Sequence, residues 1–216
     1  VRQYAARGWH VTATSRKPGE ANELRALAAA HPNIQVEALD VTDHAMVDAL
    51  AAKLKDQPLD ILINNAGTAG SMAGQRFGKF DYGSLRSTLE VNTIAPLKLS
   101  EAFAPNLRLG TQKKIVLLGT SEASFAGIDA ARLYFYRSSK AAAHMLMLNL
   151  AYELKPQGIA VAVVNPGPVD TDMMKGVHMP LQPPAVAVGK VIGIIDGLNV
   201  ANTGKFWNYS GGFVPW

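Results

Sequence analysis

Short apolar runs alternate with longer stretches of helical periodicity along most of the chain. The runs ILIN, IVLLG and IAVAVVN are apolar on both alternating faces, which is typical of strands buried on both sides by helices. The alternation itself predicts parallel βαβ units. We expect six strands, at Trp9–Thr14, Ile34–Ala38, Leu59–Asn64, Lys114–Thr120, Ile159–Asn165 and Lys205–Tyr209.

Four helices are predicted between these strands, at Glu20–Ala30, Ala45–Lys55, Ser84–Arg108 and Leu133–Leu154. Asp43 can cap the second of them, and Gly158 ends the fourth. No repeat and no linker divides the sequence. The pattern therefore predicts an α/β fold with a doubly wound, Rossmann-type parallel sheet, built as one domain over residues 1–216.

The beginning of the chain departs from this pattern. Val1–Arg7 has the character of the second half of an amphipathic helix that ends at Gly8. A doubly wound sheet places a strand and a glycine-rich turn ahead of that helix. We therefore expect the first strand and its glycine-rich turn, roughly 15 to 20 residues, to be missing from the chain.

Composition narrows the class of protein. The 216 residues are 48% hydrophobic and 18% charged, with a net charge of +4 and no cysteine. The missing cysteines exclude disulfides and thiolate metal sites and suit the reducing cytoplasm. No apolar run is long enough to cross a membrane, and no basic stripe interleaved with aromatic residues indicates nucleic-acid binding.

The clearest candidate for chemistry is the segment YRSSK, which runs from Tyr136 to Lys140. Residues four apart on a helix share a face, and a nearby ammonium favours the phenolate and lowers the pKa of a tyrosine. Such a tyrosine can act as a general acid or base. Taken alone, the spacing also fits an ordinary pair of residues on a helix surface.

Polar residues at the ends of several predicted strands strengthen the catalytic interpretation. Asn64–Gly67 follows one buried strand, Thr120 and Ser121 follow the next, and Pro166–Thr171 follows the one after. Ligands of open α/β sheets bind at the carboxyl ends of the strands. These positions therefore predict a binding site at that edge, although Asn-Gly also occurs in plain turns.

Taken together, these motifs resemble those of the short-chain dehydrogenase/reductase family over essentially the whole chain. The motifs are Asp40-Val41, Asn64-Asn65-Ala66-Gly67, Asn92 in EVNT, the Thr120/Ser121 strand end, Tyr136 with Lys140, and Pro166-Gly167 with Thr171. The stretch YFYRSSKAA and the ending GKFWNYSGGFVPW are more similar to the C-factor and sniffer-type carbonyl reductases than to other branches.

The resemblance implies catalytic roles. Tyr136 would protonate the carbonyl oxygen of the substrate, Lys140 would lower the pKa of Tyr136 and hold the nicotinamide ribose, and Asn92 would help to hold a relay water. A hydroxyl at Thr120 or Ser121 would stabilise the charge that develops on the substrate oxygen. The family usually has a Ser-Ser pair where this chain has Gly119-Thr120, so Thr120 is favoured over Ser121.

The resemblance also implies a nicotinamide dinucleotide as cofactor. Arg16, after Ser15 at the end of the first predicted strand, favours NADP(H) because an arginine there accommodates a 2′-phosphate; a solvent-facing arginine and NAD(H) remain alternatives. Asp40 and Val41 would contact the adenine side, unless Asp40 is only a helix cap. The remaining cofactor contacts implied are Asn65, Ala66, Gly67, Tyr136, Lys140, Pro166, Gly167, Val169 and Thr171.

Two further expectations concern the substrate and the oligomeric state. Asp172–Pro184, rich in methionine, is expected to form an apolar lid over the substrate. Ala141–Ala151 is apolar nearly all round, which predicts a homodimer through this helix. No cluster of residues indicates a metal. We expect a carbonyl reductase acting on a small apolar carbonyl or alcohol; the alternative is a dinucleotide-binding signalling or regulatory protein with little catalysis.

Overall fold

The computed structural model describes all residues from Val1 to Trp216. Its backbone contacts divide the chain into two compact units, Val1–Lys53 and Leu54–Trp216. The single domain expected from the sequence stays a prediction, and each unit is described by itself.

The first unit contains a parallel pair of strands with three helices. Strand β1 (Val11–Ser15) pairs with β2 (Ile34–Ala38) from Val11 opposite Ile34 to Ser15 opposite Ala38. The helices are α1 (Arg2–Ala6), α2 (Asn22–Ala30) and α3 (His44–Lys53). Ala5, Ala13 and Ile34 form the centre of its core. Asp43 accepts a hydrogen bond from the backbone N–H of Met46 at 3.0 Å, which confirms the cap predicted for α3.

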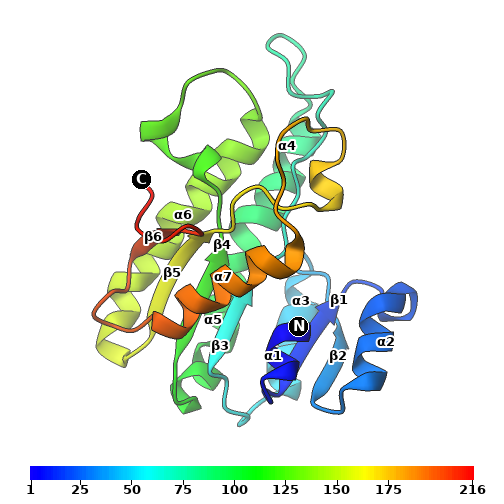
Figure 1. The fold of residues 1–216 in the computed structure, drawn as a ribbon, viewed down its shortest axis with the longest axis vertical. Coiled ribbons are helices and arrows are strands. Elements are labelled where there is room, and N and C mark those ends of the chain that lie inside the picture. Colours follow the sequence, from blue (N-terminus) through cyan, green and yellow to red (C-terminus); the bar gives the residue numbers. More distant parts are fainter. The chain divides into compact units, whose positions relative to one another are not determined.

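The second unit is built on a four-stranded parallel sheet in the order β3-β4-β5-β6. Its strands are β3 (Ile61–Asn64), β4 (Lys114–Leu118), β5 (Ala160–Asn165) and β6 (Lys205–Asn208). Its α-helices are α4 (Tyr82–Leu89), α5 (Ala95–Leu109), α6 (Tyr134–Leu154) and α7 (Pro184–Gly197). As Figure 1 shows, α5 and α6 lie on one face of the sheet and α7 on the other.

Alternation along the strands explains why both faces of this sheet are apolar. Ile115 and Leu117 of β4 pack with Met147 of α6 in one cluster, whereas Val116 between them packs with Ile195 of α7 in another. Side chains on a strand alternate between its two faces, so a strand covered on both sides must be apolar throughout. The expected α/β class with parallel strands and flanking helices is confirmed.

Two helical features differ from the sequence-based expectation. The single helix predicted over Ser84–Arg108 is longer, and a π-helical turn, η2 (Glu90–Ile94), separates α4 from α5. Helix α7 was not predicted at all, because its proline-rich start and its two internal glycines, Gly189 and Gly193, are typical of loops.

The long helix α6 carries apolar side chains on its outward face. Met145 and Tyr152 are 59% and 74% exposed, respectively, although both belong to a helix whose other face is buried. The homodimer through Ala141–Ala151 stays a prediction. No helix of the structure is both long enough and apolar enough to span a membrane.

A buried lysine at the start of β4 holds the end of α7. The ammonium of Lys114 donates to the carbonyl oxygens of Ile195 at 2.7 Å and Asp196 at 3.2 Å. These carbonyls lie in the last turn of α7, where a cation is favoured. Burial lowers the pKa of Lys114, and the nearby carboxylates of Asp196 and Asp60 oppose that effect.

We expect the substitution Lys114→Met to destabilise the protein by about 1–3 kcal/mol, because it removes the hydrogen bonds that the buried ammonium donates to the carbonyls of Ile195 and Asp196 while keeping the apolar stem. Chemical denaturation at neutral pH measures the effect. Lys55→Met, at an exposed position of the same unit, is the matched control and should change stability by less than about 0.5 kcal/mol. Equal stability of the two variants would contradict this role of Lys114.

Candidate active site

The carboxyl ends of three neighbouring strands lie at one edge of the second unit's sheet. Asn64 of β3 is paired with Leu117 of β4, and Leu118 is paired with Val164 of β5. Because these strands are parallel and in register, the segments that follow them all begin at the same edge. This is where the sequence predicted the catalytic and nicotinamide-binding residues.

The phenol of Tyr136, in the first turn of α6, shares a hydrogen bond with the hydroxyl of Thr120. Thr120 is also the N-cap of the short 3₁₀ helix η3 (Ser121–Ala123), and its Oγ1 accepts the N–H of Glu122 at 3.2 Å. Ser121 is exposed. Of the two candidate hydroxyls, the one bonded to Tyr136 is therefore Thr120.

The acidity of Tyr136 differs from the sequence-based expectation. Burial raises the pKa of Tyr136 above its ordinary value of 10.0, the hydrogen bond from Thr120 lowers it, and the negative charge of Glu122 raises it. The net effect is upward, and the lowering of this pKa by Lys140 stays a prediction. Desolvation disfavours the charged phenolate more than the neighbouring groups favour it.

Lys140 lies one helical turn beyond Tyr136 and is only 4% exposed. Its ammonium donates to the carbonyl oxygen of Leu118, the last residue of β4, at 2.9 Å. Burial lowers its pKa from 10.5 to about 8, so the cation still predominates at neutral pH. A Cβ atom built on Gly67 would lie 3.5 Å from the ammonium, so Lys140 also reaches the segment that follows β3.

Asn92 is fully buried in the π-helical turn η2, and its side chain joins two other elements of the site. Its Oδ1 accepts the N–H of Thr68 at 2.9 Å, and its Nδ2 donates to the carbonyl of Thr68 and to the hydroxyl of Ser139. The amide of Asn92 thus connects the segment after β3 to α6, and π-turns of this kind occur frequently at functional sites.

The segment Asn64–Gly67 contributes an unusual polar group. The side-chain amide of Asn64 is buried, and neither its nitrogen nor its oxygen has a hydrogen-bond partner. Asn65, Ala66 and Gly67 are exposed. Buried amides are nearly always satisfied in folded proteins, so the amide of Asn64 is an exception at the end of β3.

The segment after β5 is shaped around Gly167, which has a φ of +74°. A Cβ atom there would lie 2.5 Å from the ring of Tyr209, so glycine is required for both conformation and space. Pro166 precedes it, Val169 forms a bridge with Gln182, and Thr171 donates to the carbonyl of Val169. Val177 and Met179 of the predicted lid are exposed.

The remaining predicted cofactor residues all belong to the first unit. Ser15 ends β1, and its Oγ accepts the N–H of Lys17 at 3.3 Å; Arg16 is exposed. Asp40 accepts hydrogen bonds from the N–H and the hydroxyl of Thr42, and the charge of Arg16 adds to the lowering of its pKa. Asp40 therefore stabilises the turn that Val41 begins, whereas the cap of α3 is Asp43.

The sequence reasoning missed the pair formed by Gly119 and His144. His144 is 3% exposed and its Nε2 has no hydrogen-bond partner. Burial, with a contribution from the charge of Lys140, lowers its pKa from 6.5 to about 3, so it is neutral at physiological pH. A Cβ atom on Gly119 would lie 2.6 Å from this nitrogen and 2.3 Å from Cγ1 of Val163. The glycine in the Gly119-Thr120 pair is therefore explained by the imidazole beside it.

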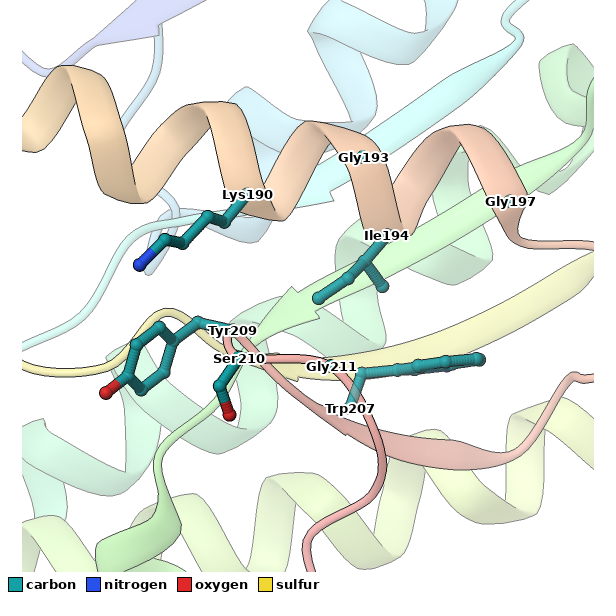
Figure 2. Close-up of a pocket in the computed structure, with 8 residues that line it drawn as sticks. All are labelled: Lys190, Gly193, Ile194, Gly197, Trp207, Tyr209, Ser210 and Gly211. Carbon is teal, nitrogen blue, oxygen red and sulfur yellow. The ribbon is translucent and has the colours of Figure 1, made fainter.

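A cavity of about 640 Å³ lies on the other face of the sheet, between α7 and the turn after β6. Figure 2 shows the side chains of Lys190 and Ile194 pointing from α7 toward Trp207 and Tyr209. None of the candidate catalytic side chains lines it. The candidate active site at the carboxyl ends of the strands is therefore separate from this cavity, and it is identified by the polar side chains that meet there.

Comparison with known proteins identifies the family of the chain. The family model for short chain dehydrogenases matches residues 1–181. The chain belongs to this family, and with it to the NAD(P)-dependent oxidoreductases.

Individual relatives support the narrower placement. The chain is 34% identical over 168 residues to the protein named C-signal of Myxococcus xanthus, which covers 78% of this chain and 99% of that protein. The structure of carbonyl reductase Sniffer of D. melanogaster superimposes with a TM-score of 0.88 at 32% identity, covering 96% of this chain and 88% of that one. An NADPH-bound carbonyl reductase from chicken fatty liver gives a TM-score of 0.88 at 31% identity, with the same coverage. The C-factor and sniffer-like branch expected from the sequence is confirmed.

We expect Gly119→Ala to destabilise the fold by about 1–3 kcal/mol, because the added methyl group meets two buried side chains that cannot move aside freely. Gly193→Ala is the matched control, since a Cβ atom there meets nothing within 4 Å and alanine is favoured over glycine within a helix. Thermal unfolding of the two variants checks this. A Gly119→Ala protein as stable as the parent would mean that the space beside His144 is not filled as described.

Proposed function

We propose that the protein is a carbonyl reductase that transfers a hydride between NADP(H) and a small or medium-sized apolar carbonyl or alcohol, with Tyr136 as the general acid or base. The observation that carries this proposal is the convergence of the Thr120–Tyr136 hydrogen bond and the buried Lys140 at the carboxyl ends of β3 and β4. A surface tyrosine–lysine pair would not bury its ammonium against a strand end.

The residues of the second unit suit the nicotinamide end of such a cofactor. The ammonium of Lys140 offers a donor for a ribose hydroxyl, and Gly67, whose Cβ position lies 3.5 Å from that ammonium, leaves space beside it. Asn65, Ala66, Pro166, Gly167, Val169 and Thr171 would complete that side. When bound, the cofactor supplies or accepts the hydride.

The residues of the first unit suit the adenosine end. The exposed guanidinium of Arg16 follows β1 and would pair with a 2′-phosphate, which favours NADP(H) over NAD(H). Ser15, Asp40 and Val41 would make the neighbouring contacts. The NADPH-bound carbonyl reductase among the similar structures supports the same preference.

The protein's own groups would move the proton. With its pKa raised, Tyr136 is protonated at neutral pH and can donate to the oxygen of a carbonyl substrate. Thr120 would hold the same oxygen, and Lys140 would place positive charge beside the phenol as it ionises. Asn92, whose amide is already engaged, would position Lys140 and a relay water through the turn that it stabilises.

The side chains around the site support an apolar substrate. Met173, Val177 and Met179, after β5, are exposed apolar groups that could close over a substrate without a strong shape preference. The carbonyl reductases among the relatives agree with this class. We retain the cytoplasm as the expected compartment, and expect no nucleic-acid partner.

A second candidate, a signalling or regulatory protein with little catalysis, is favoured by the similarity to C-signal. A panel of aldehydes, ketones and quinones separates the two candidates, because only the enzyme consumes NADPH when a carbonyl is added. The Thr120–Tyr136–Lys140 arrangement favours the enzyme, since a purely binding protein needs no proton donor beside a buried ammonium.

We expect Tyr136→Phe to lower kcat for carbonyl reduction by about 10²–10⁴-fold, the usual contribution of a general acid, while the Kd for NADPH changes little. The rate is followed by NADPH absorbance and the Kd by NADPH fluorescence. Tyr152→Phe makes the same chemical change at an exposed position of the same helix and should leave kcat unchanged. A Tyr136→Phe variant that keeps most of its activity would refute the role of the phenol.

A further inference from the structure

The segment between β4 and α6 contains a group of ion pairs centred on Glu122. Its carboxylate accepts hydrogen bonds from Arg137, with Oε2 at 2.5 Å from Nη2 and 2.8 Å from Nε, and from Arg132 at 3.1 Å. Arg132 also pairs with Asp129 at 2.6 Å. Burial raises the pKa of Glu122, but the hydrogen bonds from Arg132 and Arg137 outweigh it and hold the pKa below its ordinary value. Glu122 is therefore a carboxylate at neutral pH.

Arg137 connects this group to the residue next to the proposed general acid. It directly follows Tyr136 in α6, its side chain is 10% exposed, and its Nη1 donates to the carbonyl oxygen of Ala130 at 2.7 Å. Leu133, between Ala130 and the helix, has a φ of +53°, a left-handed conformation that non-glycine residues seldom adopt. The guanidinium of Arg137 binds the carboxylate of Glu122 and the carbonyl of Ala130 at the same time. A lysine ammonium, which is a single point charge, could not hold both groups in this geometry.

The backbone of Glu122 orients the hydroxyl of Thr120. The N–H of Glu122 donates to Thr120 Oγ1 at 3.2 Å, which occupies a lone pair of that oxygen. The hydroxyl proton of Thr120 is then available for the oxygen of Tyr136, with which Thr120 shares its other hydrogen bond. The position of η3, and hence the direction of this hydroxyl, depends on what anchors the side chain of Glu122.

We propose that Glu122 and Arg137 are positioning residues for the acid–base step: their ion pair fixes the turn that aims Thr120 at Tyr136. This inference rests on the proposed role of Tyr136. It assigns the direction of the Thr120 hydroxyl to two residues outside the family motifs described above.

The carboxylate of Glu122 also acts electrostatically on Tyr136. The charged side chains of α6 and of the preceding segment are Lys140, Arg137, Glu122, Arg132 and Asp129, and His144 is neutral. Among them, Glu122 raises the pKa of Tyr136, because a negative charge disfavours phenolate. Replacing Glu122 with a neutral residue should therefore lower that pKa.

The test is the pH profile of kcat/KM for alcohol oxidation in the Glu122→Gln variant, which keeps a hydrogen-bond acceptor of the same shape. Oxidation needs the phenolate, so its rate rises with pH, and we expect the midpoint to move down by about half a pH unit. Asp129→Asn is the matched control, because it removes a charge from the same group at a residue that does not act on Tyr136, and its midpoint should stay with the parent. An unmoved or raised midpoint for Glu122→Gln, or an equal shift for Asp129→Asn, would overturn the electrostatic role.

A second variant tests positioning separately from charge. Arg137→Lys keeps the positive charge but cannot hold Glu122 and the carbonyl of Ala130 together. We expect kcat to fall by about tenfold, the effect of a small misplacement of a reacting group, while the Kd for NADPH and the midpoint of the pH profile stay unchanged. A kcat equal to that of the parent would overturn the positioning role.

If the parent protein turns over no carbonyl or alcohol substrate, the proposed function is wrong, but the effect of Glu122 on Tyr136 can still be tested. In that case the ionisation of Tyr136 is followed directly, by the ultraviolet absorbance that the Tyr136→Phe variant lacks. A lower phenol pKa in Glu122→Gln than in the parent supports the effect of Glu122 on Tyr136, and an unchanged one overturns it.

Discussion

The hydrogen bond from the ammonium of Lys140 to the carbonyl of Leu118 places a positive charge inside the second unit, 4% exposed, with no carboxylate against it. A buried charge is costly unless polar groups replace the water it has lost. Its surroundings are adapted to their own burial as well. His144, one turn further along α6, is kept neutral by its burial and in part by the charge of Lys140, and Gly119 leaves room for its ring. Asn92 joins the segment after β3 to α6 through three hydrogen bonds.

The same constraint accounts for the chemistry. A cation with little solvent around it acts strongly on nearby groups, but Tyr136 is itself desolvated, and in this structure desolvation has the larger effect on the phenol. The site is therefore set to hold a proton on Tyr136 rather than to release it. Thr120 and Glu122 act on that proton in opposite directions, the first favouring phenolate and the second opposing it.

Much of this arrangement could be predicted from the sequence, because it depends on local patterns. The strand Ile34–Ala38 was predicted with its observed bounds, and the i, i+4 spacing of Tyr136 and Lys140 placed both residues on one helix face. The motifs Asn64–Gly67, Thr120 with Ser121, and Pro166–Thr171 each follow a predicted strand, and this position predicted that they meet at one edge of the sheet. The period of the apolar residues and the position of a motif after a strand are enough to predict these features, and neither depends on how the side chains pack.

What the sequence could not predict depends on contacts between distant segments. Helix α7 was missed because glycine and proline are weak helix formers, whereas burial of Val191 and Ile195 against the sheet stabilises it. The need for glycine at position 119 depends on His144 of α6 and Val163 of β5, which lie far from it in the sequence. The direction of the pKa shift at Tyr136 likewise depends on burial, which spacing alone does not reveal.

The hydroxyl of Thr120 acts on a desolvated Tyr136, and a carbon-13 NMR titration of the tyrosine rings measures this effect, with the Tyr136 signal assigned by its loss in a phenylalanine variant. We expect the pKa of Tyr136 to lie above its ordinary value of 10.0, and to be higher still in Thr120→Val, because the hydrogen bond that favours phenolate is then lost. A Tyr136 signal that titrates at the same pH with and without the Thr120 hydroxyl would show that Thr120 does not act on the phenol.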